Sequence, residues 1–159
     1  MVFGVNKPDK ADDIISCASC TTNCIAPVVE LMDRHFGVKK ATMTTIHAYT
    51  STQGIVDSPN KKIRRGRAAA ANFVPTTTGA TKATTVITQL DGKFEGSAIR
   101  GPVPVGSISD INFVLGRKVG KDQVNDMFRH EAESDRYRGI LGATEEPLVS
   151  SDIIKDTRA

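Results

Sequence analysis

Ser19-Cys20-Thr21-Thr22-Asn23 is the stretch around which we expect this 159-residue chain to fold. Thr21, Thr22 and Asn23 are residue types that cap helix N-termini, so the stretch predicts the start of a helix at about Cys20. Apolar residues then follow at helical spacing, at positions Ile25, Val28, Val29, Met32 and Phe36. The apolar pair Ile14-Ile15 before the stretch predicts the end of a strand, so Cys20 would lie where a strand turns into a helix.

Cys20 has the position of a reactive thiol. The first N–H groups of a helix have no partner inside it, and the positive end of the helix dipole points the same way. Both effects favour the thiolate, which is the nucleophilic form of cysteine. A small, buried and inert cysteine is the alternative interpretation. The Ser and Thr neighbours favour the nucleophile.

The composition is that of an ordinary globular domain. Hydrophobic residues make up 39% and charged residues 25%, and no apolar run has the length of a membrane span. The three cysteines, Cys17, Cys20 and Cys24, lie within eight residues of one another and are odd in number. Such a set is a poor disulfide framework, so we expect a cytoplasmic location. The net charge of +3 permits an anionic partner without requiring nucleic acid.

The rest of the chain predicts alternating strands and helices around a long irregular segment at 50–67. Gly37 is expected to end the first helix. Further helices are expected at 79–90 and 121–134, with a short helical turn at 68–71. Strands are expected at 2–5, up to 17, 38–48, 96–103, 108–115, 140–141 and 147–154.

His47 is the candidate base for Cys20. It follows Cys20 by 27 residues, at the far end of the predicted strand 38–48. A helix followed by a strand that runs back beside it would return His47 to the end of the sheet where Cys20 lies. A nucleophilic cysteine needs a base within hydrogen-bond reach, which such an arrangement would supply. His35 and His130 fall in helical patterns and are expected on the surface.

Several segments are suited to anions. The basic cluster consists of Lys61, Lys62, Arg64, Arg65 and Arg67, and the guanidinium group donates two parallel hydrogen bonds to phosphate. The second capping cluster, 76–79, offers hydroxyls and free N–H groups at a predicted helix start, as do the neighbours of Cys20. A charged run is most often only a solvated surface. Together with one reactive thiol, however, these segments indicate a phosphorylated substrate.

Two other classes of function remain as alternatives. Cys17-x-x-Cys20, with Cys24 and His47, has part of the pattern of a zinc or redox site, but a second cysteine pair is missing and we expect no metal. The basic run could bind nucleic acid, but no aromatic residue lies between Lys61 and Arg67 to stack on bases, so such binding is not expected.

Four motifs in order give the chain a family resemblance. They are Ala18-Ser19-Cys20-Thr21-Thr22-Asn23-Cys24, His47-Ala48-Tyr49-Thr50, Arg64-Arg65-Gly66-Arg67-Ala68-Ala69 and Pro75-Thr76-Thr77-Thr78-Gly79-Ala80. From about position 2 to 152, the chain closely resembles the catalytic domain of phosphorylating glyceraldehyde-3-phosphate dehydrogenase, an enzyme of glycolysis and gluconeogenesis. The resemblance implies an α+β fold, with a mixed, mostly antiparallel sheet and helices packed on one face.

The resemblance also implies roles for individual residues. Cys20 would attack the aldehyde of glyceraldehyde 3-phosphate, with His47 as the base and the Cys20 N–H as the oxyanion donor. The cofactor would be NAD or NADP, and phosphate would cleave the thioester to give 1,3-bisphosphoglycerate. Thr50 and Arg100 match the residues that hold the substrate's own phosphate. The site for the attacking phosphate is matched by Ser19, Thr21, Arg65, Thr78 and Gly79, of which Arg65 is one choice among three arginines.

The family implies parts outside this chain. These are a preceding NAD-binding Rossmann domain, for which no G-x-G-x-x-G follows a strand here, and closing strands and a helix beyond Ala159. We therefore expect a fragment that is inactive alone. Full-length members are usually homotetramers, in which the loop at about 50–71 lines the neighbouring subunit's cofactor site.

Cys17 stands where the family usually has Asn, and the stretch from Thr78 to Arg100 is one residue short of the commonest spacing.

Two other functions are compatible with some of these motifs. Erythrose-4-phosphate dehydrogenase resembles the chain at the cysteine motif but generally lacks the motifs that contain Thr50 and Thr78, so the triose enzyme is favoured. A non-catalytic interaction module would follow if no cofactor domain were encoded with this chain.

Overall fold

A four-stranded mixed sheet is the framework of the molecule, in a computed structural model that describes residues 1–159. Its strands lie in the order β2-β3-β1-β4. β1 and β3 are parallel, and the other two pairings are antiparallel. The strands are β1 (Val38–Ala48), β2 (Val74–Thr76), β3 (Phe94–Gly101) and β4 (Ser107–Leu115).

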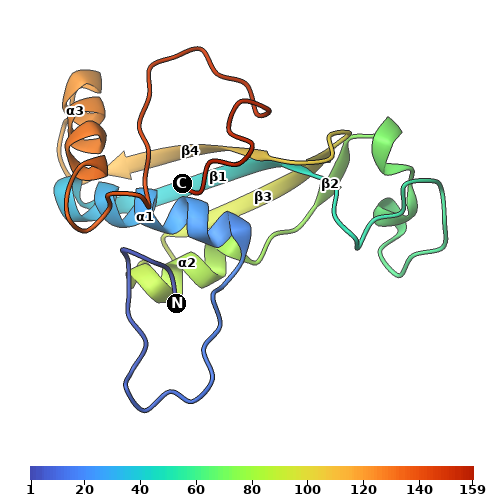
Figure 1. Cartoon of the computed structure of the whole chain (residues 1–159), viewed down its shortest axis with the longest axis horizontal. Coiled ribbons are helices and arrows are strands. Elements are labelled where there is room, and N and C mark those ends of the chain that lie inside the picture. Colours follow the sequence, from blue (N-terminus) through green and yellow to red (C-terminus); the bar gives the residue numbers. More distant parts are fainter.

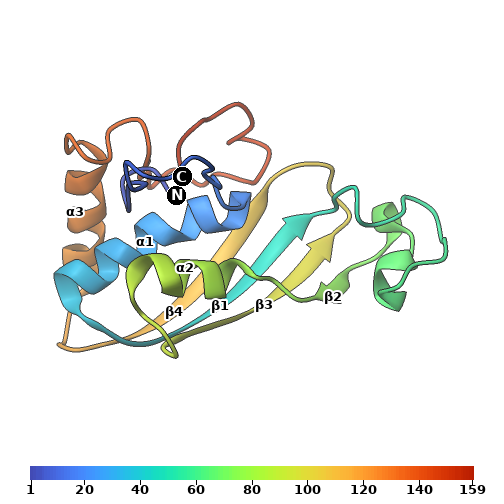
Figure 2. The same ribbon diagram turned by 90° about the horizontal axis from the view of Figure 1, so that it is seen from below.

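Helices cover one face of this sheet. Figure 2 shows α1 (Cys20–Phe36) and α2 (Ala80–Thr88) lying side by side on that face, with α3 (Lys121–Ala132) at one end of α1. Two short 3-10 helices, η1 (Ile63–Gly66) and η2 (Ala69–Ala71), lie in the loop that projects from the opposite end (Figure 1). The predicted α+β fold is confirmed. None of the helices combines the length and the apolar character that a membrane crossing requires.

Capping residues set both ends of α1. The Ser19 hydroxyl accepts a hydrogen bond from the Thr22 N–H at 3.1 Å, which satisfies one of the donors left free at the helix start. Gly37 ends the helix with φ 70°, and its N–H donates to the Asp33 carbonyl at 2.8 Å. The predicted start at Cys20 and the predicted cap at Gly37 are both confirmed.

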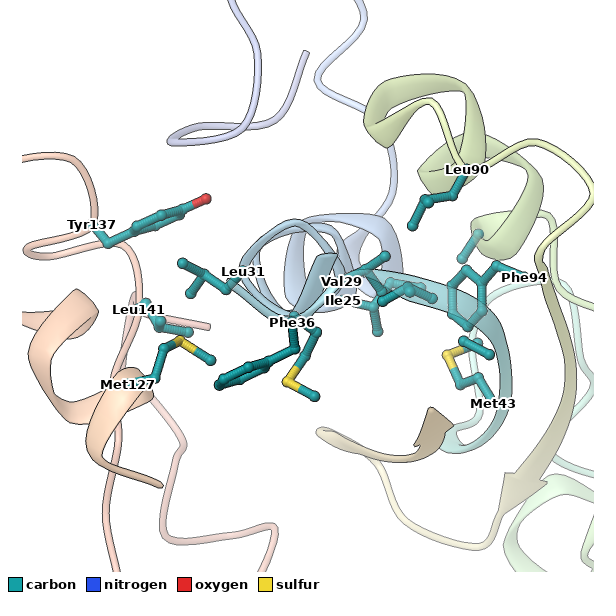
Figure 3. Packing of buried hydrophobic residues seen from close by; sticks show 14 residues of the cluster. Ile25, Val29, Leu31, Phe36, Met43, Leu90, Phe94, Met127, Tyr137 and Leu141 are labelled. Atoms are coloured by element: carbon teal, nitrogen blue, oxygen red, sulfur yellow. The ribbon is translucent and has the colours of Figure 1, made fainter. Parts of the chain in front are cut away.

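The core lies between α1 and the sheet. Ile25, Val29 and Phe36 from α1 are buried there together with Met43 of β1 and Phe94 of β3 (Figure 3). Their spacing on α1 is that of one helix face, which the sequence predicted. Burial of each large side chain contributes about 1.5–3 kcal/mol. This packing fixes the start of α1 over the sheet, where the site is built.

Four of the predicted strands are wrong, and turns or loops replace them. In 2–5, Gly4 has φ 75°, and the N–H groups of Val5 and Asn6 both donate hydrogen bonds to the Val2 carbonyl, which forms a turn. Positions 14–17 are exposed and pair with no strand. Turns whose hydrogen bonds span two to four residues occupy 137–141 and 148–156. Short β-branched runs form strands only where a partner strand lies alongside, and these have none.

Two further differences concern the middle of the chain. The short strand β2 was not predicted, because it is only three residues long and contains Pro75, which suits edge strands alone. α2 ends at Thr88 rather than at 90, because Gln89 takes the left-handed conformation at φ 59° and caps it.

His35 is half-buried, which corrects its expected surface position, whereas His130 is exposed as predicted. The Nε2 atom of His35 lies 2.7 Å from the Glu131 carboxylate, which also pairs with Arg34 at 3.0 Å. Burial would raise the pKa of Glu131, but the hydrogen bonds from His35 and Arg34 outweigh burial and lower it. This buried carboxylate therefore ties α1 to α3 while it is ionised.

Glu131→Gln is expected to lower the free energy of unfolding by about 1.5–3 kcal/mol at pH 7, the usual contribution of a hydrogen bond to a charged group. A lowered pKa in the folded state means that the carboxylate stabilises the fold above its unfolded pKa, near 4.3, and loses this effect as the pH falls further. The difference from the wild type should thus narrow below about pH 4 in urea titrations. Glu145→Gln, at an exposed partner of Arg129, is the control. Equal effects of the two variants would contradict this role for Glu131.

Candidate active site

Cys20 is the first residue of α1, and its side chain is exposed. Ser19 takes an extended conformation and its hydroxyl binds the Thr22 N–H, so the N–H groups of Cys20 and Thr21 are left without partners inside the helix. These donors and the positive end of the helix dipole lie at the residue that carries the thiol. The geometry is that of a nucleophile beside an anion-binding helix start.

A strained turn leads into Cys20. Ala18 has φ 60°, a left-handed conformation that costs a residue with a Cβ atom about 1–2 kcal/mol. The Asn23 amide, one turn into the helix, donates to the Cys17 carbonyl at 2.8 Å and to the Ser19 carbonyl at 2.9 Å. These two hydrogen bonds from Asn23, inside α1, stabilise the turn and so fix the position of Cys20 at the start of the helix. Strain of this kind is concentrated at functional sites.

His47 reaches the thiol from the end of β1. Its Nε2 atom lies 3.4 Å from the Cys20 sulfur, within reach of a sulfur hydrogen bond. The Nδ1 atom lies 2.8 Å from the Ala48 carbonyl, which can only accept, so Nδ1 carries the proton. In the neutral ring Nε2 is then the acceptor that faces the sulfur. The sequence interpretation, that β1 runs back to bring His47 to Cys20, agrees with this arrangement (Figure 2).

Cys20 and His47 open into a cavity of about 380 Å³ between the starts of α1 and α2 and the sheet. The cavity floor comes from paired positions on β1 and β3, since His47 lies opposite Arg100 and Thr45 lies opposite Ala98. Eight of the nine residues expected at the site line this cavity, namely Ser19, Cys20, Thr21, His47, Thr50, Thr78, Gly79 and Arg100.

Arg100 offers an unpaired charge to the cavity. Its Nη1 atom is buried without a hydrogen-bond partner, as is the hydroxyl of Thr45 beside it. Burial, and then the nearby charge of Arg65, lower the pKa of Arg100. Two guanidinium groups that repel each other beside unpaired donors form a site that an anion would stabilise.

Arg65 does not line the cavity, and this differs from the expectation. It lies in η1, where its guanidinium donates to the Thr76 hydroxyl at 2.8 Å from Nη2 and at 3.1 Å from Nε. Thr76 itself lines the cavity, so Arg65 lies outside the cavity but in contact with a residue that lines it. Arg64 and Arg67 are exposed, and Arg67 pairs with Asp57. Of the three arginines, the half-buried Arg65 thus lies nearest to the role assigned to it.

The start of α2 is the second helix N-terminus at the cavity. Gly79 caps this helix without a side-chain hydrogen bond, while the Thr78 hydroxyl accepts from the Ala80 N–H at 3.1 Å. Thr76 and Thr77 line the same wall. Two helix starts and a chain of hydroxyls therefore meet at the thiol, which is an arrangement suited to phosphate groups.

The sequence analysis gave no individual site role to the cavity residues Thr22, Thr45, Thr76 and Thr77, although it expected the cluster 76–79 to suit anions. Thr45 could have been found, because positions 45 and 47 of a strand face the same side. The others depend on how α2 approaches α1, which no local pattern reveals. No cluster of three or more histidine, cysteine or acidic side chains has the geometry to hold a metal ion.

Iodoacetamide is expected to alkylate Cys20 first at neutral pH, because the exposed thiol lies at a helix start beside His47. Cys24 should react at least about tenfold more slowly, since burial, and then the charge of Cys20, raise its pKa. Tandem mass spectrometry is needed to resolve the sites, because all three cysteines lie on one tryptic peptide between Lys10 and Arg34. Faster labelling of Cys17 or Cys24 would contradict the assignment of Cys20.

Comparison with known proteins agrees with this geometry. Residues 19–159 match the family model described as glyceraldehyde 3-phosphate dehydrogenase, C-terminal domain. The chain is 52% identical to glyceraldehyde-3-phosphate dehydrogenase 2 of Streptomyces avermitilis over 98% of its own length and 48% of that protein. It is 50% identical to glyceraldehyde-3-phosphate dehydrogenase of Mycobacterium tuberculosis over 98% of its length and 47% of that protein. The corresponding protein of Borreliella burgdorferi is 47% identical over 96% of the chain and 47% of the protein.

The chain spans about half the length of the curated relatives that it matches. The match nevertheless covers nearly all of the chain, including both helix starts and the strands that carry His47 and Arg100. On these grounds, the chain belongs to the glyceraldehyde 3-phosphate dehydrogenase family and corresponds to its C-terminal domain.

Proposed function

We propose that the full-length protein containing this chain oxidises glyceraldehyde 3-phosphate to 1,3-bisphosphoglycerate through a thioester on Cys20. The observation that carries the proposal is the 3.4 Å approach of His47 Nε2 to the Cys20 sulfur where two helix starts meet. The names of the relatives support the same reaction. Three free cysteines support a reducing, cytoplasmic setting.

In the first half of the reaction, the Cys20 sulfur attacks the aldehyde carbon and its proton passes to His47 Nε2. The oxygen that becomes negative is stabilised by the Cys20 N–H at the start of α1. His47 returns this proton to the oxygen, which completes the thiohemiacetal, and takes it back as a hydride leaves the same carbon and a thioester remains. The hydrogen bond from Nδ1 to the Ala48 carbonyl keeps Nε2 directed at the reacting atoms throughout.

In the second half, inorganic phosphate attacks the thioester carbon and the carbon–sulfur bond breaks. The thiolate that leaves lies at the start of α1, beside the positive end of the helix dipole. His47, which now carries a proton, is positioned to stabilise the negative charge that develops. Both steps thus use the same pair of side chains.

The two phosphates occupy different parts of the cavity in this proposal. The substrate's own phosphate lies between Thr50 and Arg100. The attacking phosphate lies where the two helix starts meet, and its partners are Ser19, Thr21, Thr78, Gly79 and Arg65. The unpaired Nη1 of Arg100 supports the first site, and the converging helix starts support the second. For Arg65 to reach phosphate, it must exchange its contacts with Thr76 for the anion.

A nicotinamide cofactor, NAD or NADP, would accept the hydride from the thiohemiacetal carbon. A second cavity of about 510 Å³ opens beside Cys20 and His47, on a side lined by Gly106 and Ser107, and this space fits a planar ring next to the sulfur. The remainder of the dinucleotide would be held by a preceding Rossmann domain, and the closing strands and helix would follow this chain in the full-length protein.

We further propose a homotetramer. The loop between β1 and β2 projects beyond the end of the sheet (Figure 1), as a segment that reaches into a neighbouring subunit would. Exposed apolar side chains on the face of the sheet opposite the helices, including Ile46 of β1 and Ile108 of β4, support an interface between subunits.

Arg100→Ala in the full-length enzyme is expected to weaken use of glyceraldehyde 3-phosphate, and Arg65→Ala to raise the Michaelis constant for inorganic phosphate. Each arginine–phosphate contact contributes roughly 1.5–3 kcal/mol, or about one to two decades in apparent affinity. Cofactor reduction, measured by absorbance with glyceraldehyde and with its phosphate over a range of phosphate concentrations, tests both the function and the two sites.

Arg64→Ala is the matched control, because Arg64 belongs to the same 3-10 helix and is exposed. It should leave both constants within about twofold of the wild type, as expected of an exposed charge. Glyceraldehyde, which has no phosphate, should be affected little by Arg100→Ala. Equal increases of both constants in both arginine variants would contradict the division into two sites. A lack of phosphate-dependent cofactor reduction by the wild type would contradict the function itself.

A further inference from the structure

Cys17 and Cys20 form a Cys-x-x-Cys pair of which the proposed reaction uses only the second member. Both thiols are free and exposed. Paired cysteines at this spacing, with one at a helix start, are typical of redox-active sites. Cys17 takes no part in the cavity beside Cys20, so the proposed reaction assigns it no role.

The backbone between the two cysteines is curled rather than extended. In a fully extended chain, Cα atoms three residues apart are separated by about 10 Å, whereas a disulfide needs about 4.4–6.8 Å. Here the Cys17 and Ser19 carbonyls both accept from a single nitrogen atom of Asn23, and Ala18 between them is left-handed. This turn brings Cys17 back toward the start of α1.

Cys24 is the alternative disulfide partner for Cys20, but the geometry of α1 disfavours a bond between them. Cys20 and Cys24 lie one turn apart in α1, where Cβ atoms are about 5–6 Å apart, while a disulfide needs about 3.5–4.5 Å. Cys24 is also half-buried. Burial, and then the charge of Cys20, raise the pKa of Cys24, which keeps it protonated and slow to attack. Cys17 lies outside the helix, so its backbone can move without breaking helical hydrogen bonds.

We propose that Cys17 is the resolving cysteine for oxidised Cys20. A peroxide supplies the oxidant: the Cys20 thiolate attacks one oxygen, the O–O bond breaks, and the products are Cys20 sulfenic acid and hydroxide, which takes up a proton to become water. The Cys17 thiolate then attacks the Cys20 sulfur, the S–O bond breaks, and a second water leaves as the disulfide forms. Two thiols and one hydrogen peroxide thus give one disulfide and two waters.

The disulfide would place Cys20 in a reversible oxidised state. The Cys20 sulfur that faces His47 would then be bonded to Cys17, so it could not attack a substrate. It would also prevent a second peroxide from converting the sulfenic acid to the irreversible sulfinic acid. A dithiol reductant would restore both thiols. The proposal depends on the thiol chemistry of Cys20 and not on which aldehyde the enzyme oxidises.

Equimolar hydrogen peroxide, followed by intact-mass measurement and thiol counting, tests the proposal on the whole protein. The wild type is expected to lose the mass of two hydrogen atoms and to retain the Cys24 thiol, and dithiothreitol should reverse the change. Cys24→Ser, the matched control, should lose the same mass. Cys17→Ser and Cys17→Asn should not, and dimedone should trap Cys20 as sulfenic acid in both.

Either of two results would overturn the proposal. In the first, the Cys17 variants still lose two hydrogen atoms while Cys24→Ser does not, which would make Cys24 the partner. In the second, the wild type yields only sulfenic acid, or a disulfide between two chains on a non-reducing gel. Circular dichroism should match the wild type in all three variants, since Cys17 is exposed and Cys24 is only half-buried. Catalytic assays are not needed, so failure here is separate from failure of the proposed reaction.

Discussion

Cys20→Ser in the full-length protein is expected to abolish oxidation of glyceraldehyde 3-phosphate, with a loss of roughly 10⁴-fold or more, as is typical when a catalytic nucleophile is removed. A serine hydroxyl is not ionised at neutral pH, and its ester would not be cleaved readily by phosphate. The start of α1 and the hydroxyl chain around it should persist, because the change replaces one exposed atom. The rate of cofactor reduction at saturating substrate measures the effect.

A second measurement separates loss of the nucleophile from general damage. Without phosphate, the wild type treated with substrate and cofactor should gain the mass of the acyl group on Cys20, because no acceptor can cleave the thioester. Cys20→Ser should gain none. Cys24→Ser, one turn along the same helix, should gain it as the wild type does. An acyl group on Cys24, or substantial turnover by Cys20→Ser, would show that the nucleophile lies elsewhere.

Two of the elements that carry the site, α1 and β1, were the best predicted from the sequence. α1 and β1 agree with their expected bounds because each has a long periodic pattern and a clear end signal, such as Gly37. The wrong strands, at 2–5 and 147–154 among others, were short apolar runs with no periodicity to test. Whether such a run pairs depends on a neighbouring strand, which is a property of the tertiary fold.

For the site too, features set by neighbouring elements of the chain could be predicted, and features set by the tertiary fold could not. The pairing of Cys20 with His47 could be expected because one helix and one strand connect them, and that connection fixes which ends meet. The position of Arg65 behind Thr76 could not, because a long irregular loop carries it there. The buried, unpaired Nη1 of Arg100 depends on the register of β3 against β1, which sequence alone does not determine.

His47→Asn is expected to lower the turnover rate by about 10²–10⁴, which is the usual contribution of a positioned acid–base group. Asparagine keeps a polar side chain at the end of β1 but cannot accept and return a proton. The turnover rate should therefore fall, while binding of the substrate's phosphate at Thr50 and Arg100 changes little. The turnover rate, measured beside the Michaelis constant for the aldehyde, tests this.

The matched control is His130→Asn, at the exposed histidine on α3, far along the chain from the cavity. It should keep the wild-type rate and Michaelis constant. His47→Asn should also slow alkylation of Cys20 by iodoacetamide, because the ring that accepts the thiol proton is lost. If His47→Asn kept full turnover, the 3.4 Å contact with sulfur would be structural only, and a different base would have to serve Cys20.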